Sequence, residues 1–326
     1  MALPTTMMAA VMPKAHEIEM RTVPVPTLAP ADVLLRVHAC GICGTDLHIL
    51  HGESRGVVFP IIAGHELAGE VVAVGAQADD VPLGARVVAE GRAGTGFSRD
   101  GAYAEYVSVP KEMLHYLAPH VDMIEAALID PLACAVNVIN QADFASTDRV
   151  AVIGQGSSGL CMLQAARVMV GCELAAIDHH DESLALSRQF GAALTINPKT
   201  ADALAAIMDW TQNEGLDGVM EATGRESAVN LALKLVRRGG RIVIYGVFSQ
   251  PVTLDLDTLM YRQLQMVGAC GSPGTYAKAV QLLSEGKVDL RSIVGRIMPL
   301  SQLPEAIELL EQRQVFKVVI VPDPLL

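Results

Sequence analysis

Residues whose side chains could do chemistry gather in two short segments. Residues 40–51 read CGICGTDLHILH, and residues 64–66 read Gly-His-Glu. Thiolate, imidazole and carboxylate groups are the ligands that zinc takes, and a catalytic zinc site keeps one position for water or substrate. The pair Cys40-x-x-Cys43 could instead be a redox pair, but such a pair belongs beside a βαβ unit. Because this pair lies among β-type segments, the two segments indicate a zinc site.

A second candidate site is the glycine motif at 154–159, which reads GQGSSG. It follows the apolar run 149–153 and opens an apolar helix. Glycines at these positions allow a tight turn and a close approach of pyrophosphate, and the helix N-terminus offers free N–H groups to the phosphates. The motif in this context predicts dinucleotide binding.

Asp178 ends the next apolar run, near the spacing of about 20 residues at which an acidic residue meets the adenosine ribose. Its carboxylate would accept hydrogen bonds from the ribose hydroxyls and repel a 2′-phosphate, so NAD is favoured over NADP. Protonated His179 and His180 could soften that repulsion. The simpler interpretation makes both histidines surface residues of a βα loop.

Two different patterns of secondary structure are expected along the chain, and each contains one of these candidate sites. Up to about residue 120, short strands with Gly and Pro between them predict an all-β, barrel-like region, with strands at 32–39, 69–75, 86–89 and 103–109. From about residue 122, apolar strands alternate with helices, which predicts a parallel sheet covered on both faces. The expected strands are 149–153, 173–178, 218–221, 241–245 and 265–268, and the expected helices are 159–170, 183–190, 225–236 and 276–283. The strand expected at 316–321 has no helix after it, so we expect it to return to the first region.

Composition excludes several classes of protein. Lys plus Arg number 24 against 36 Asp plus Glu, a net charge of -12, and no basic run of five or more residues occurs, so neither nucleic acid nor an anionic membrane is an expected partner. The richest apolar stretch, 149–177, is broken by polar residues and predicts no membrane span. The first residues lack the basic region of a signal peptide, and six cysteines are too few for a disulfide scaffold. We therefore expect a soluble cytoplasmic protein with a small-molecule substrate.

Taken together, the motifs resemble a known family. The segments GICGTD-x-H at 41–48 and GHE at 64–66 are similar to those of the zinc-dependent alcohol dehydrogenases of the medium-chain dehydrogenase/reductase superfamily. The resemblance covers nearly the whole chain and includes DGAYAEY at 100–106, IDPLA at 129–133, the glycine motif and KVVI at 317–320. The sorbitol and threonine dehydrogenase branch is the most similar. The implied fold is α/β, with a GroES-like β-rich catalytic domain (1–125 and 293–326) and a Rossmann doubly wound parallel-sheet domain (126–292).

The resemblance also implies a ligand set for one zinc ion. Cys43 and His65 would be ligands, and Glu66 would be a ligand or a close carboxylate that exchanges with water. Asp130 occupies the region of the third protein ligand, where the branch usually has Glu. An Asp among apolar residues needs a cation or hydrogen-bond donors; alternatively, it caps a helix that begins near Pro131.

Further roles follow from the same resemblance. Asp46 would orient His65 by accepting its free ring N–H. Thr45 would contact the substrate oxygen, and His48 would be the outer end of a proton relay. Cys40 would pack in the interior and His51 would lie exposed on a loop. The implied coenzyme contacts are Gly154, Gly156, Ser157, Ser158, Gly159, Asp178, Gly246, Val247 and Cys270.

Two departures from the family pattern limit the expected number of zinc ions and the expected substrates. The four-cysteine lobe that often binds a structural zinc would fall between Val88 and Gly101, but that stretch contains no cysteine, so only the catalytic zinc is expected. Polyol-specific relatives often have Arg-Tyr where this chain has Cys270-Gly271-Ser272. Without that arginine, sorbitol itself is not an expected substrate.

The implied activity is hydride transfer between a secondary alcohol, polyol-like or amino-alcohol-like, or its ketone, and NAD(H). Zinc would lower the pKa of the alcohol, and Thr45 and His48 would carry its proton to solvent. One alternative is a zinc-free quinone or enoyl reductase of the same superfamily, which would lack the ligand set. Another is a catalytically dead nucleotide-binding protein, which would have lost a ligand or Thr45. Because relatives are dimers or tetramers, we expect a homo-oligomer.

Overall fold

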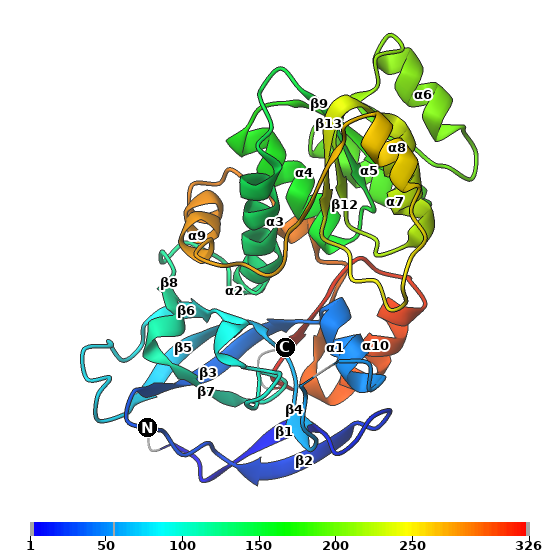
Figure 1. Cartoon of the computed structure of the whole chain (residues 1–326). Coiled ribbons are helices and arrows are strands. Elements are labelled where there is room, and N and C mark those ends of the chain that lie inside the picture. Colours follow the sequence, from blue (N-terminus) through cyan, green and yellow to red (C-terminus); the bar gives the residue numbers. More distant parts are fainter. Residues whose placement is uncertain (1–2, 55, 324–326) are drawn as a thin grey trace. The chain divides into compact units, whose positions relative to one another are not determined.

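The computed structural model describes residues 3–54 and 56–323, and its internal contacts divide the chain into two units (Figure 1). The first unit runs up to Asp130 and resumes at Ala279, and the second is Pro131–Lys278. The domain limits drawn from the sequence, 125/126 and 292/293, stay a prediction.

The first unit contains two β-sheets. The larger has the strand order β15-β16-β3-β5-β6-β8, with β7 also paired to β3, and the smaller has the order β2-β1-β4. Apolar side chains from both sheets form one core, which includes Met12, Leu35 and Tyr103. The strands are β1 (Thr6–Met12), β2 (Glu19–Pro24), β3 (Asp32–Gly41), β4 (Ile61–Ile62), β5 (Glu66–Val74), β6 (Arg86–Ala89), β7 (Tyr106–Pro110), β8 (Leu114–Tyr116), β15 (Arg296–Pro299) and β16 (Val318–Val321).

Strand β16 confirms the expected return of the tail to the first unit. It pairs antiparallel with the end of β3, with Val319 opposite Gly41 and Ile320 opposite Cys40. Its four residues are all buried. The last described strand therefore completes the sheet beside the cysteine segment.

Helix α1 (Gly44–Leu50) contradicts the expectation of an all-β first region, and the strand expected at 103–109 begins later than expected. The helix follows the cysteine segment directly, and strand β7 begins at Tyr106 rather than at 103. Residues 102 and 103 instead donate backbone hydrogen bonds to the carbonyls of Gly64 (2.8 Å) and Ala63 (3.0 Å). This pairing places Tyr103 in the interior, where it is fully buried. The first unit also contains α2 (Met123–Ala126) and α10 (Leu303–Glu311). Two further helices are divided between the units: α3 (Ile129–Ala142) begins in the first, and α9 (Tyr276–Ser284) begins in the second.

The second unit is a six-stranded parallel sheet in the order β11-β10-β9-β12-β13-β14. Strands β9 (Arg149–Ile153) and β12 (Leu216–Glu221) are neighbours, and the chain winds outward from them in opposite directions, so the carboxyl ends of these strands form a topological switch point. The other strands are β10 (Glu173–Ile177), β11 (Leu194–Ile196), β13 (Val236–Ile244) and β14 (Gln265–Gly268). The helices are α4 (Ser157–Met169), α5 (Asp181–Gln189), α6 (Ala203–Trp210), α7 (Glu226–Leu235) and α8 (Leu256–Tyr261). This arrangement confirms the predicted doubly wound α/β sheet.

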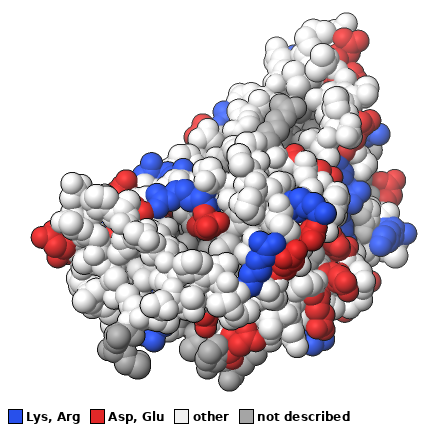
Figure 2. Space-filling view, turned by 90° about the horizontal axis from the view of Figure 1, so that it is seen from below, with Lys and Arg blue, Asp and Glu red and all other residues white. Residues whose placement is uncertain are grey.

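Charged side chains are interspersed on the face shown in Figure 2. Acidic and basic residues lie next to one another there, and the basic ones do not merge into a continuous area. Within the described ranges, no helix is long and apolar enough to cross a membrane.

Candidate active site

Three of the residues expected at the zinc site come together in the first unit. One ligand atom each from Cys43, His65 and Glu66 lies within 4.8 Å of the other two. Cys43 lies immediately before α1, His65 lies immediately before β5, and Glu66 is the first residue of β5, so the start of a helix and the start of a strand position the three groups. His65 and Glu66 are buried and Cys43 is half-buried. Sulfur, nitrogen and oxygen donors in this grouping suit a zinc ion.

Asp46 organises the two segments that carry these donors. Its Oδ2 accepts hydrogen bonds from the Cys43 backbone N–H and the Tyr103 hydroxyl, each at 2.8 Å. Its Oδ1 accepts from the Gly64 N–H at 3.2 Å and lies 3.5 Å from His65 Nδ1. Because Nδ1 faces Asp46, the other ring nitrogen of His65 is left for a metal, as a carboxylate–histidine–metal arrangement requires.

The charges of Asp46 and His65 shift the pKa of each other. Burial alone would lower the pKa of His65, but Asp46 and Cys43 together outweigh burial and hold that pKa well above its ordinary value. Burial alone would raise the pKa of Asp46, yet the charge of His65 and the donated hydrogen bonds lower it. Asp46 is therefore an ionised, fully buried acceptor.

Gly64 lets the segment before His65 pass through the interior. Its φ is +92°, a left-handed conformation that favours glycine. A Cβ at this position would lie 2.8 Å from the Tyr103 ring and 2.9 Å from Cys40 Sγ. Cys40 is itself fully buried in the core, which agrees with the packing role expected for it.

Glu66 forms an ion pair with Lys317 that no motif indicated. Both side chains are 1% exposed. Burial raises the pKa of Glu66, and the Lys317 ammonium opposes that rise. For Lys317, burial acts to lower the pKa, but Glu66, Cys43 and Asp46 together outweigh burial and raise that pKa. The one available signal was a lone lysine in the otherwise apolar tail FKVVIV.

Asp130 does not join the three grouped residues within the described structure. It is the second residue of α3, inside the first helical turn, so it is not the N-cap that the alternative interpretation made it. Its negative charge nevertheless contributes to raising the pKa of Glu66. Asp130 therefore lies close enough to act on the site electrostatically.

Helix α1 carries the two residues expected to move protons. The Cys43 thiol donates to Thr45 Oγ1 across 3.5 Å. His48 stands one helical turn after Thr45, so both side chains lie on the same helix face. His48 Nδ1 is 2.6 Å from Glu53 Oε2, on the partly exposed side of the helix. His51 is exposed at the end of α1, as expected, and its ring also bonds to Glu311 at 2.6 Å.

The glycine motif forms the expected strand–turn–helix in the second unit. Gly154 follows β9, Gly156 precedes α4, and Ser157 and Ser158 form the first turn of that helix. A Cβ on Gly159 would lie 1.8 Å from the Gly154 carbonyl oxygen, so only glycine fits there. The first turn of α4 therefore faces the switch point with its backbone N–H groups.

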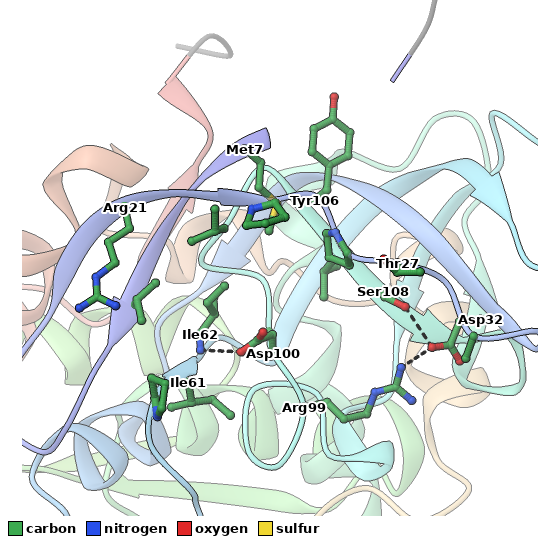
Figure 3. A pocket seen from close by; sticks show the side chains of 18 residues that line it. Met7, Arg21, Thr27, Asp32, Ile61, Ile62, Arg99, Asp100, Tyr106 and Ser108 are labelled. Atoms are coloured by element: carbon green, nitrogen blue, oxygen red, sulfur yellow. Dashed lines mark hydrogen bonds and ion pairs between the residues drawn. The ribbon is translucent and has the colours of Figure 1, made fainter. Parts of the chain in front are cut away.

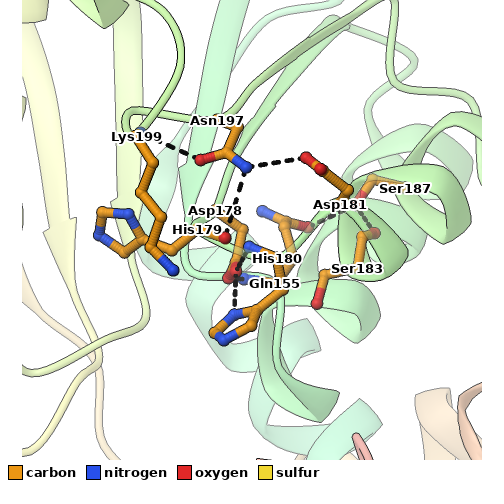
Figure 4. A network of polar contacts seen from close by, with 9 residues as sticks. All are labelled: Gln155, Asp178, His179, His180, Asp181, Ser183, Ser187, Asn197 and Lys199. Carbon is orange, nitrogen blue, oxygen red and sulfur yellow. Dashed lines mark hydrogen bonds and ion pairs between the residues drawn. The ribbon is translucent and has the colours of Figure 1, made fainter.

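Asp178 is tied to this turn and to its own loop (Figure 4). Its Oδ2 accepts the Gln155 backbone N–H at 2.7 Å, and its Oδ1 accepts from both the backbone N–H and the ring Nδ1 of His180, each at 2.9 Å. Both histidines lie in the loop between β10 and α5, where His179 is exposed and the His180 side chain is 40% exposed, as the surface interpretation expects; His180 is in addition bonded to Asp178. The carboxylate is thus fixed at the end of β10, where the ribose of a dinucleotide binds.

The other expected coenzyme residues follow later strands of the same sheet. Gly246 and Val247 come after β13 and Cys270 after β14, so all stand at the carboxyl edge that carries Gly154. Val247 and Cys270 are exposed. Sequence reasoning missed Asn197, which bonds His179 O at 3.4 Å and Asp181 Oδ1 at 2.8 Å and so joins the loops after β10 and β11.

A separate cavity of about 550 Å³ lies in the first unit (Figure 3). Its walls are mostly apolar, from β1, β2 and β4, and none of the three grouped zinc-site residues lines it. At its rim Arg99 pairs with Asp32, and Asp100 Oδ1 accepts the Ile62 N–H at 2.9 Å. Arg99 and Ser108 both bond to Asp32, and Arg21 pairs with Glu19, so the charged groups of the cavity already have partners.

Comparison with known proteins agrees with this geometry. The family model described as "Alcohol dehydrogenase GroES-like domain" matches residues 29–119, and "Zinc-binding dehydrogenase" matches residues 159–285. The chain is 34% identical to an L-threonine 3-dehydrogenase of Symbiobacterium thermophilum, over 93% of this chain and 94% of that protein. It is 30% identical to a sorbitol dehydrogenase of Bacillus subtilis, over 98% and 99%.

Solved structures give the same result. A putative zinc-binding dehydrogenase from Sinorhizobium meliloti, bound to NADP, matches with a TM-score of 0.92 and 29% identity, over 98% of this chain and 100% of that one. The alcohol dehydrogenase TADH from Thermus sp. ATN1 matches with a TM-score of 0.88 and 31% identity, over 97% and 100%. With its GroES-like unit, its parallel nucleotide-binding sheet and its grouped Cys, His and Glu, the chain belongs to the zinc-binding, NAD(P)-dependent alcohol dehydrogenases of the medium-chain dehydrogenase/reductase superfamily.

Proposed function

We propose that this enzyme oxidises a secondary alcohol with a neighbouring polar group, polyol-like or amino-alcohol-like, and reduces the matching ketone. The observation that carries the proposal is the grouping of Cys43, His65 and Glu66 within 4.8 Å. The family resemblance to threonine and sorbitol dehydrogenases supports the substrate class. The Cys270-Gly271-Ser272 segment lacks the arginine of polyol-specific relatives, so sorbitol should be a poor substrate.

Cys43 and His65 would hold one zinc ion, with carboxylate oxygen from Glu66, Asp130 or both. Zinc bound there supplies a Lewis acid that lowers the pKa of the alcohol. The Thr45 hydroxyl would take the substrate proton, and His48 would pass it outward toward Glu53, which is half-exposed. Asp46 would keep His65 in the ring orientation that leaves one nitrogen free for the metal.

NAD is the proposed coenzyme in preference to NADP. The support is the fixed Asp178 carboxylate, which can accept from a ribose diol and would repel a 2′-phosphate. The nicotinamide bound by the second unit would accept the hydride.

We also infer a cytoplasmic homo-oligomer. All six cysteines are free thiols in the structure, which suits a reducing compartment. The dimer or tetramer is inferred by analogy with the family.

The experiment that tests the function combines metal analysis with a substrate panel. Zinc content of the purified enzyme should be one ion per chain. NADH formation should be fastest with L-threonine or small vicinal diols and slower with sorbitol. Two tightly bound zinc ions per chain would overturn the single-site assignment, and quinone reduction without any zinc would support a zinc-free reductase instead.

Within the same experiment, Asp130→Asn examines the proposed third ligand. It should retain less zinc than wild type and lose nearly all turnover, because a neutral amide is a weaker zinc ligand than a carboxylate. Wild-type zinc content together with wild-type turnover would remove Asp130 from the site.

A further inference from the structure

An aromatic ring covers one face of the candidate zinc ligand His65. The ring centroids of Phe97 and His65 are 4.8 Å apart, and the ring planes are inclined by 37°. Aromatic pairs at this separation and tilt attract each other beyond the area that they bury. Phe97 also packs against the core of the first unit and is only partly exposed.

Phe97 lies on a short loop, residues 90–100, that is fixed at both ends by contacts to other parts of the first unit. At the start, Glu90 accepts from the His115 ring at 2.8 Å, and its backbone N–H donates to Met113 O at 3.0 Å. At the end, Arg99 pairs with Asp32 and Asp100 bonds to Ile62, as Figure 3 shows.

The turn between these ends is tight. The Gly94 carbonyl accepts backbone N–H groups from Phe97 at 2.8 Å and from Ser98 and Arg99 at 2.9 Å each. A Cβ on the neighbouring Gly96 would lie 3.0 Å from the Gly64 carbonyl, so the loop lies directly on the segment before His65. Phe97 is therefore held by its loop over the histidine ring.

Gly91, which precedes this turn, has no side chain and so leaves room for the Phe97 ring. A Cβ on Gly91 would lie 3.4 Å from His65 Cβ and 3.7 Å from the edge of Phe97. An added methyl group would fit, but a larger side chain would compete with the Phe97 ring for the same face. Gly91 and Phe97 are thus complementary in size.

We infer that Phe97 is a positioning residue that holds the His65 ring at its face while Asp46 holds it at its edge, and so slows loss of the metal. The inference rests on the proposed zinc site. A ring restrained at both places has less freedom to rotate away from a metal, and its covered face is less accessible to water. The part of the chain that replaces the family's four-cysteine lobe would in this way support the catalytic ion.

The test is the rate at which a chromophoric chelator removes zinc from purified, zinc-loaded enzyme. Phe97→Ala should release zinc about fivefold faster than wild type, the effect expected for loss of one aromatic pair. Phe59→Ala is the matched control, because Phe59 is also partly buried against the same core; it should stay within about twofold of wild type. Unfolding is followed in parallel, so that faster release from an unstable variant is recognised.

Two further variants decide the matter if Phe97→Ala does not fold. Phe97→Tyr keeps the ring and should release zinc at the wild-type rate, whereas Phe97→Leu keeps apolar volume without a ring and should release it faster. Equal rates for the Tyr and Leu variants would overturn the inference, and so would equal rates for Phe97→Ala and Phe59→Ala. Failure of the wild-type enzyme to retain zinc at all would instead overturn the proposed function on which the inference rests.

Discussion

The zinc region buries its charges, whereas the nucleotide region keeps its charge near the surface and holds it with backbone groups. The side chains of Asp46, Glu66 and Lys317 are 0–1% exposed and that of His65 is 6% exposed. Asp178 is 14% exposed and is held by two backbone N–H groups and one imidazole. Charges removed from water need specific partners, whereas a carboxylate near water needs only orientation.

This difference has a structural origin. The buried charges come from α1, β5 and the segment before β16, which are far apart along the chain, so tertiary packing must assemble them. The glycine turn and Asp178, in contrast, come from one strand–turn–helix and the strand after it, close together in sequence. The zinc region should therefore be the more sensitive of the two to loss of a single partner.

The largest effect is expected at Lys317. Lys317→Met removes the only cation seen pairing with Glu66 among the described residues and leaves a buried carboxylate without its ion-pair partner. Loss of one partner of a buried pair costs about 3–5 kcal/mol of the free energy of unfolding. Urea unfolding of the metal-free enzyme measures this loss.

The matched control for that prediction is the double variant Lys317→Met with Glu66→Gln. It removes both charges, so it should recover most of the lost stability. If the single and double variants were equally unstable, the charge of Glu66 would not be the cause.

A smaller effect is expected from Asp46→Asn. The amide keeps the size of the side chain but loses the charge that faces His65, and loss of such a partner weakens metal affinity by about 10–100-fold. Competition with a chelator of known zinc affinity measures the change. Glu53→Gln, on the exposed side of α1, is the control and should leave zinc affinity unchanged.

In the nucleotide region, Asp178→Ser should change coenzyme preference rather than stability. Removing the carboxylate would remove the ribose hydrogen bonds and the repulsion of a 2′-phosphate that we propose for Asp178. The ratio of kcat/KM for NAD to that for NADP should fall by about tenfold, which corresponds to about 1.4 kcal/mol. A wild-type enzyme that already prefers NADP at pH 7.5 would contradict the role given to Asp178.

The difference between a site assembled from distant segments and one assembled from neighbouring segments also explains which features the sequence could predict. The glycine turn and Asp178 form a local pattern, and strands β6, β9 and β14 begin and end where the apolar runs indicated. Cys43 and His65 were recognised from their short segments. The Glu66–Lys317 pair and the Phe97 contact depend on strand pairing and loop path, which residue types alone do not specify. Helix α1 was missed because a seven-residue helix carries little periodic signal.

The smallest effect is expected for the alkylation rates of Cys172 and Cys270, two cysteines of the second unit. Burial raises the pKa of Cys172 to about 11, so at pH 8 only about one thiol in 1,000 is ionised. Exposed Cys270 should therefore be alkylated first, and bound NAD should slow its reaction, because it stands at the coenzyme edge of the sheet. The Cys172 rate should rise about tenfold per pH unit up to pH 11 and should not respond to NAD.

That experiment also reports on stability at alkaline pH. The folded-state pKa of Cys172 lies above its unfolded value, so the folded state binds the thiol proton more tightly. This contribution to the free energy of unfolding is fully present below pH 9 and is lost as the pH rises through 11. Mass spectrometry of the alkylated peptides, with unfolding followed at each pH, separates the two effects.

The pairing of β16 with β3 also sets the order in which the molecule can be completed during translation. The ribosome releases β3, Cys43 and Glu66 first, then the whole of the second unit, and only afterwards Lys317 and β16. The second unit is one uninterrupted piece of nascent chain and can fold as soon as it emerges. The first unit must wait with an unfilled sheet position beside Cys40 and an uncompensated carboxylate at Glu66. The region made first is thus finished last.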